Sequence, residues 1–107
     1  MRKAFVWRRR NLAHIAKHGV SPQEARFVVE RASRPYPMRV GRRKWIVRGR
    51  TGTGRALQVI FLILDAHEVS ITELTLADLV AFESNEEVVY VIHARDLTDR
   101  ERRRLRP

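Results

Sequence analysis

The chain has 107 residues, 44% of them hydrophobic, and this length supports one modest hydrophobic core in a single domain, residues 1–107. Lysine and arginine total 22 against 12 acidic residues, so the formal net charge of +10 indicates an acidic partner, with nucleic acid as the first candidate. The absence of cysteine excludes disulfides and thiolate nucleophiles, which makes the cytoplasm the expected compartment. The longest apolar run, 56–64, is too short to cross a bilayer, so we expect no membrane partner.

The N-terminal third is predicted to form a short strand over 4–7, followed by helices over 9–18 and 22–32. Gly19 is a preferred stop for the first helix. Ser21 and Glu24 have capping-box spacing for the second helix. The pattern therefore predicts a helix hairpin that carries Lys17 and His18 at its corner.

The middle of the chain is predicted to form two strands after a proline-containing connector over 34–37. The segment 44–50 alternates, which places Arg48 and Arg50 on one face beside Ile46. A turn over 51–54 leads into a second strand over 55–64, which is apolar on both faces and is typical of a central strand.

The segment 65–86 is predicted to be an insertion that contains a short amphipathic helix around 75–82. A last strand over 88–94 leads to Thr98 and Glu101, which again have capping-box spacing, so the C-terminus is predicted to be a short basic helix. We therefore expect an α+β domain: a small, mainly antiparallel sheet of about four strands packed against the N-terminal helix pair, with an inserted helix and a C-terminal helix.

An ordered set of motifs resembles the BrnT-like toxins of type II toxin–antitoxin systems, across most of the chain outside 65–86. The motifs are Phe5-Val-Trp7, Asn11, Lys17-His18-Gly19-Val20, Glu24-Ala25, Trp45-x-x-x-Gly49-Arg50-Thr51, Gly54-Arg55-x-Leu57-x-Val59-x-Phe61 and Ala94-Arg95…Thr98-x-x-Glu101-Arg102. The resemblance implies a RelE-like fold, ribonuclease activity that stops translation, and a neighbouring ribbon-helix-helix antitoxin that holds the toxin inactive. The chain departs from that pattern at four positions and at the insertion; the four are Val6, Arg8, His93 and Leu105.

The residues themselves are compatible with metal-independent RNA cleavage. Such cleavage needs an acid, a base and cations that stabilise charge on the phosphorus. His18 is the candidate base or acid, with Lys17 beside it, and Arg50 and Arg95 are candidate phosphate clamps. The simpler alternatives are that Lys17 and His18 only complement the end of a helix and that both arginines form ion pairs.

His93 alternates with Val89 and Val91 and is expected to share their face; if that face also carries Arg95, both side chains enter one cleft, and otherwise His93 is a packed histidine. His14 lies one helical turn before His18, a spacing that metal sites use. The sequence supplies no third ligand nearby, so we predict no metal and no cofactor.

The C-terminal arginines and Arg48 are the predicted nucleic-acid-binding residues, because clustered cations gain from counterion release. The C-terminal set is Arg100, Arg102, Arg103, Arg104 and Arg106. Trp7, Trp45 and Tyr36 could stack on bases, although core packing is sufficient to explain both tryptophans.

Two functions therefore follow from the sequence. The first is an endoribonuclease toxin that acts on RNA and forms a hetero-oligomer with its antitoxin or a homodimer. The second is a non-catalytic RNA- or DNA-binding module on the same scaffold. Both require the basic surface, and only the first requires a titratable residue at its centre.

Overall fold

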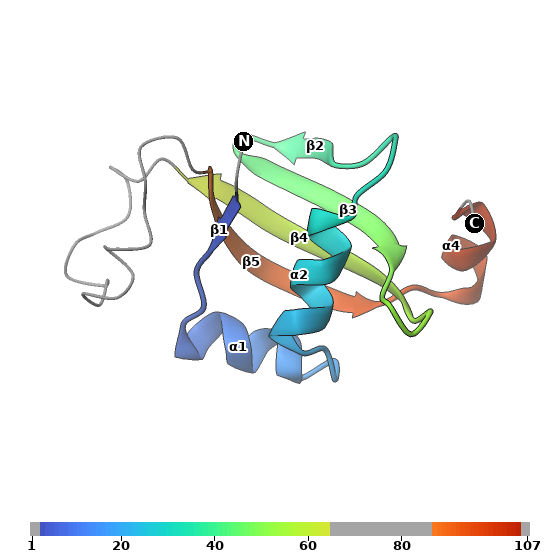
Figure 1. Cartoon of the computed structure of the whole chain (residues 1–107), viewed down its shortest axis with the longest axis horizontal. Helices are drawn as coiled ribbons and strands as arrows, with labels where there is room; N and C mark the ends of the chain where they lie inside the picture. The colour runs from blue at the N-terminus through green and yellow to red at the C-terminus, as the bar shows by residue number, and fades with distance from the viewer. Residues whose placement is uncertain (1–2, 65–86, 106–107) are drawn as a thin grey trace.

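The computed structural model describes residues 3–64 and 87–105, which form an α+β domain (Figure 1). The elements in chain order are β1 (Lys3–Phe5), α1 (Arg9–Ala16), α2 (Pro22–Glu30), β2 (Met38–Gly41), β3 (Lys44–Arg50), β4 (Ala56–Leu64), β5 (Glu87–Asp96) and α4 (Asp99–Arg104). The inserted helix predicted around 75–82 and Arg106 lie outside the described residues. No helix in the described part of the chain is long and apolar enough to cross a membrane.

One mixed sheet of five strands has the order β1-β5-β4-β3-β2. The neighbours among β2 to β5 pair antiparallel, whereas β1 pairs parallel to β5. The α+β class is confirmed, but the prediction of about four mainly antiparallel strands is wrong in the strand count and in leaving out the parallel pair. β1 has only three residues, so its direction is set by the path of the chain and by no local pattern.

The strand that the sequence did not predict is β2, which forms a hairpin with β3. Its four residues are all exposed, so they lack the alternation of a half-buried strand. The two residues between the paired Gly41 and Lys44 are arginines, and Arg43 has φ 60°. Such tight turns normally carry glycine or asparagine at the two central positions, and here both positions are arginine.

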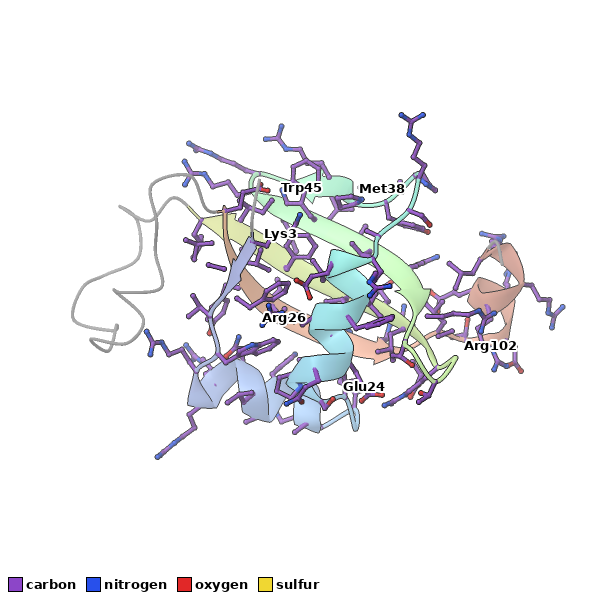
Figure 2. The ribbon with its side chains drawn as sticks, in the orientation of Figure 1. Lys3, Glu24, Arg26, Met38, Trp45 and Arg102 are labelled. Carbon is purple, nitrogen blue, oxygen red and sulfur yellow. The ribbon has the colours of Figure 1, made fainter. Side chains whose placement is uncertain are left out.

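The hydrophobic core lies between the sheet and the two N-terminal helices: α2 crosses the sheet over β3 and β4, and α1 packs against β5 (Figure 1). Ile15 of α1 and Val28 of α2 meet fully buried residues of the central strands, among them Val47 and Phe61. Trp7, Trp45 and Tyr36 pack against this core, as predicted for the two tryptophans. Figure 2 shows Trp45 on the sheet and Arg102 at the far end, on α4.

The start of α1 is held by Asn11, which is 2% exposed. Its side-chain oxygen accepts a hydrogen bond from the Arg8 amide at 2.6 Å, and its amide group donates to the Val6 carbonyl at 3.1 Å. Asn11 therefore joins the segment after β1 to the first turn of α1, the helix that carries His14 and leads to the candidate residue His18.

We expect Asn11→Ala to destabilise the protein by roughly 2 kcal/mol, because it removes the hydrogen bonds to the half-buried Arg8 amide and to the buried Val6 carbonyl. Urea denaturation measures this loss. Arg10→Ala, at an exposed position on the same helix, is the control and should change the free energy of unfolding by less than about 0.5 kcal/mol. Equal effects of the two substitutions would contradict the role of Asn11.

Candidate active site

The first candidate residues lie where α1 ends and the chain turns into α2. Gly19 has φ 67°, a left-handed conformation that glycine adopts without strain. Ser21 Oγ accepts a hydrogen bond from the Glu24 amide at 3.1 Å, and the Glu24 carboxylate accepts one from the Ser21 amide at 3.0 Å. The predicted helix stop and capping box are confirmed, and Lys17 and His18 lie exposed at the corner.

A cluster of three histidines joins this corner to β5. The ring centroids of His18 and His93 are 5.3 Å apart, those of His14 and His93 are 5.8 Å apart, and those of His14 and His18 are 6.5 Å apart. His14 and His18 lie one helical turn apart, and His93 comes from the strand against which α1 packs. Among residues 3–64 and 87–105, no group of three histidine or acidic side chains is placed to hold a metal ion.

The strand position of His93 differs from the prediction. A bulge lies between the pairs Ile60–His93 and Phe61–Val91, so one extra residue of β5 separates His93 from Val91. Neighbouring residues on β4 face opposite sides of the sheet, so His93 and Val91 also face opposite sides. The prediction that His93 shares the face of Val89 and Val91 is therefore wrong, and both valines are buried in the core instead.

The bulge leaves His93 in a half-buried position beside α1, and this position lowers its pKa. Burial is the largest cause, because it disfavours the charged imidazolium, and the positive charges of His18, His14 and Arg95 act in the same direction. His93 is therefore biased toward the neutral form, the state that accepts a proton.

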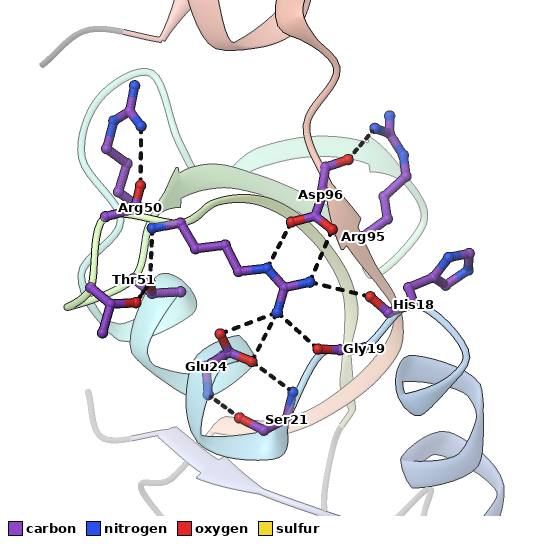
Figure 3. A network of polar contacts seen from close by, with 11 residues as sticks. His18, Gly19, Ser21, Glu24, Arg50, Thr51, Arg95 and Asp96 are labelled. Atoms are coloured by element: carbon purple, nitrogen blue, oxygen red, sulfur yellow. Dashed lines mark hydrogen bonds and ion pairs between the residues drawn. The ribbon is translucent and has the colours of Figure 1, made fainter.

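The Arg55 guanidinium fixes the helix corner against the sheet (Figure 3). It donates to the Asp96 carboxylate at 2.7 and 2.9 Å and to the Glu24 carboxylate at 3.2 Å. It also donates to the carbonyls of Gly19 at 2.8 Å and His18 at 3.2 Å. One side chain from β4's N-terminal turn thus positions the backbone of His18 relative to β5, which carries His93.

These contacts change the proton affinity of the groups around Arg55. The Arg55 hydrogen bonds are the main cause that lowers the pKa of Asp96. The pKa of Glu24 is also lowered, first by the hydrogen bond from the Ser21 amide and then by Arg55. The pKa of Arg55 is raised, chiefly by Asp96. All three groups are therefore charged at neutral pH.

A second polar network occupies the face of the sheet opposite the hydrophobic core. Arg48, Gln58 and Arg95 are directly opposite one another on β3, β4 and β5. Glu101 of α4 accepts two hydrogen bonds from Arg95, at 2.8 and 2.9 Å, and one from Arg48 at 3.0 Å. Arg48 also donates to Gln58 at 3.0 Å. The ion-pair alternative for Arg95 is therefore observed.

Glu101 also accepts a hydrogen bond from the Thr98 amide at 2.8 Å, so its predicted capping role is confirmed. Arg95, followed by the Thr98 amide, lowers the pKa of Glu101, which keeps this carboxylate ionised. The same carboxylate thus caps α4 and binds two of the predicted phosphate-binding arginines.

The other described arginines that were predicted to bind phosphate or nucleic acid lie around α4. Arg50 is exposed, donates to the Gly54 carbonyl at 3.2 Å, and lines a cleft of about 420 Å³ with three residues of α4. The other lining residues are Asp99, Arg102 and Arg103. Arg100 and Arg104 are exposed on the same helix. Arg50 therefore lies with the basic helix rather than with His18.

The structure thus gathers the predicted residues in two groups. His18, Lys17 and His93 lie at the junction of α1 and β5, and Arg48, Arg50 and the α4 arginines lie around α4. Arg95 connects the groups, because its charge acts on His93 while its guanidinium binds Glu101.

Sequence reasoning missed two members of these networks, Arg55 and Asp96. It assigned no role to Gln58, and for His14 it noted only the spacing of one helical turn to His18. Arg55 follows Gly54, which has φ 90°. The available signal for this ion pair was an arginine directly after a turn glycine, together with an acidic residue at the end of the last strand. It gave no partner, because Arg55 and Asp96 are 41 residues apart in the chain.

No protein-family model matches the chain, and no curated protein matches it significantly.

We expect Arg55→Gln to lower stability at pH 7 by roughly 1–2 kcal/mol, because it leaves Asp96 and Glu24 without their cation. The folded-state pKa values of both carboxyls lie below their ordinary 3.8 and 4.5, so the stabilisation is present above those values and is lost as pH falls through the lowered ones. The difference in melting temperature between wild type and variant should therefore shrink below about pH 4. A difference that stays constant with pH, or one matched by exposed Arg42→Gln, would contradict this assignment.

Proposed function

We propose that this protein is a metal-independent endoribonuclease toxin of the BrnT-like class, with a RelE-like fold, that cleaves RNA and stops translation in the cytoplasm. The observation that carries the proposal is the 5.3 Å separation of the His18 and His93 rings. Two imidazoles at this spacing can serve one phosphodiester, because the base and the acid act on oxygens that flank the same phosphorus. The resemblance of the ordered motifs supports the same activity.

In the proposed reaction, His93 takes the proton from a ribose 2′-hydroxyl, and that oxygen attacks the adjacent phosphorus. The bond from phosphorus to the 5′-oxygen breaks, and His18 gives a proton to the leaving oxygen. The products end in a 2′,3′-cyclic phosphate and a 5′-hydroxyl. His93 is the base because its lowered pKa keeps it neutral, and Lys17 and Arg95 supply positive charge for the transition state.

The partner we propose is a ribbon-helix-helix antitoxin that binds this protein as a hetero-oligomer and suppresses cleavage. Its support is the family resemblance together with the net charge of +10, which favours an acidic partner surface. RNA and the antitoxin would then compete for the same positive charge.

A non-catalytic nucleic-acid-binding module is the second candidate. The observation that favours it is that Glu101 already binds both Arg48 and Arg95. A carboxylate in this place opposes the approach of a phosphate to Arg95, so the catalytic cation would have to exchange partners on binding RNA.

We expect His18→Gln and His93→Gln each to reduce RNA cleavage in EDTA by about 100-fold or more, because each removes one proton-transfer group. Cleavage of a labelled single-stranded RNA, resolved on a gel, measures the effect. His14→Gln is the matched control, because it removes a ring of the same cluster that transfers no proton in the proposed reaction.

The result separates the two candidates. Wild-type cleavage that survives His18→Gln would overturn the assigned role, and so would an equal loss in His14→Gln. RNA binding by the wild type, with no cleavage of free or ribosome-bound RNA, would favour the binding module.

The pH dependence of kcat/KM tests the assignment of the base. The rate should rise with pH as His93 loses its proton, with a midpoint below the ordinary 6.5, because burial and the neighbouring positive charges favour its neutral form. Circular dichroism over the same range excludes unfolding as the cause. A rising limb centred above pH 6.5 would contradict the assignment of His93 as the base.

A further inference from the structure

A second cleft, separate from the histidine cluster, has a volume of about 710 Å³. This volume lies within the range of about 300–1,000 Å³ that small-molecule and cofactor sites occupy. Its walls come from the connector after α2, from β3 and from the end of α4. The lining residues used below are Ser33, Arg34, Tyr36, Arg48, Arg104 and Leu105.

The cleft exists because β2 is shorter than β3. β2 pairs with β3 only from Lys44 to Ile46, so within the described residues the rest of β3 has no strand on its outer side. The connector after α2, Arg48 of β3 and the end of α4 line that space. The walls are therefore side chains from three segments that are distant in the sequence.

The charge of this cleft is positive and is only partly balanced. Arg48 is bound by Glu101 at 3.0 Å and by Gln58 at 3.0 Å. Arg34 and Arg104 are exposed, and their side chains form no hydrogen bond or ion pair with other residues in the described ranges. Two guanidiniums thus remain available for an anion, and their forked donors suit phosphate oxygens.

The cleft also has an aromatic wall. Tyr36 packs against the hydrophobic core and lines the cleft as well. Its ring is therefore held in place before any ligand arrives, and Leu105 adds an apolar surface. A fixed aromatic ring near guanidiniums matches the two parts of a nucleotide, a base that stacks and a phosphate that binds cations.

We propose that this cleft binds one nucleotide unit of single-stranded RNA, with the base against Tyr36 and the phosphate against Arg34 and Arg104. The proposal rests on the proposed function for the choice of RNA as the ligand. A single strand is favoured over a duplex, because paired and stacked bases offer no free face to an aromatic side chain. Arg48, already bound to Glu101, forms the inner wall.

The test uses a short, fluorescein-labelled 2′-O-methyl oligonucleotide and the full-length protein, with binding followed by fluorescence anisotropy. The methyl group removes the nucleophile of the proposed cleavage, so binding is measured without turnover. Arg104→Ala should weaken binding roughly tenfold and reduce the slope of log affinity against log salt by about 0.7, the value for one phosphate contact on a single strand.

The stacking contact has its own variants. Tyr36→Leu should weaken binding about tenfold with little change of the salt slope, whereas Tyr36→Phe should keep the wild-type affinity because it keeps the ring. Arg42→Ala is the matched control, since Arg42 is exposed on the β2–β3 turn and its loss removes the same charge outside the cleft. Circular dichroism checks that Tyr36→Leu is folded, and exposed Arg104 tests the site independently of the core.

Affinities of Arg104→Ala and Tyr36→Leu equal to that of Arg42→Ala would overturn the proposal. Equal binding of the matching duplex would overturn the stacking contact on which it depends. Cleavage of unmodified RNA by the wild type, measured separately, distinguishes the two proposals. If wild type cleaves no RNA but the cleft variants still lose binding, the proposed function fails and the nucleotide site stands. If wild type cleaves RNA but the cleft variants bind like Arg42→Ala, the nucleotide site fails and the proposed function stands.

Discussion

The position of the histidine cluster depends on the hydrogen bonds of one guanidinium. Arg55 joins the carboxylates of Asp96 and Glu24 to the carbonyls at the end of α1, so β5, α2 and the helix corner meet at one side chain. Arginine suits this place because its rigid planar fork carries five N–H donors, whereas a lysine ammonium carries three. Because His18 lies at this corner and His93 lies on β5, the distance between their rings depends on the contacts of Arg55.

The positive charge of this protein is divided between two uses. Arg55, Arg48 and Arg95 bind carboxylates and hold the sheet, the helix corner and α4 together. Arg34 and Arg104 are exposed, and neither has a carboxylate partner within the described ranges. The net charge therefore overstates the surface available to an acidic ligand, and the unpaired arginines define where such a ligand gains most.

Local signals in the sequence were sufficient for α1, α2, α4 and the central strands. The glycine stop, the two capping boxes and the alternation of 44–50 act over a few residues, and each is confirmed by backbone hydrogen bonds or strand register. Features that depend on distant contacts were missed. β2 has no buried face, and the bulge at His93 follows from pairing with β4, which moved this residue out of the valine face.

The candidate site shows the same division. The i, i+4 spacing of His14 and His18 is visible in the sequence, but the third ring comes from a strand 75 residues after His18. The pairing of Arg95 with Glu101 could not be chosen over a phosphate-binding role, because both use the same donors. Only the fold decides which anion a guanidinium meets in the absence of a ligand.

The two proposed sites are physically connected through α4. Arg48 lines the cleft, Arg95 acts on His93, and Glu101 binds both. Arg48 lies on β3 and Arg95 lies on β5, and two strand spacings separate these strands by roughly 10 Å. The histidine cluster itself offers few cations, so most of the affinity for RNA would come from the cleft and α4. Binding energy gained away from the reacting phosphate can then hold the 2′-hydroxyl at the imidazole that accepts its proton, and this is how a small site with few charged groups can still position its substrate.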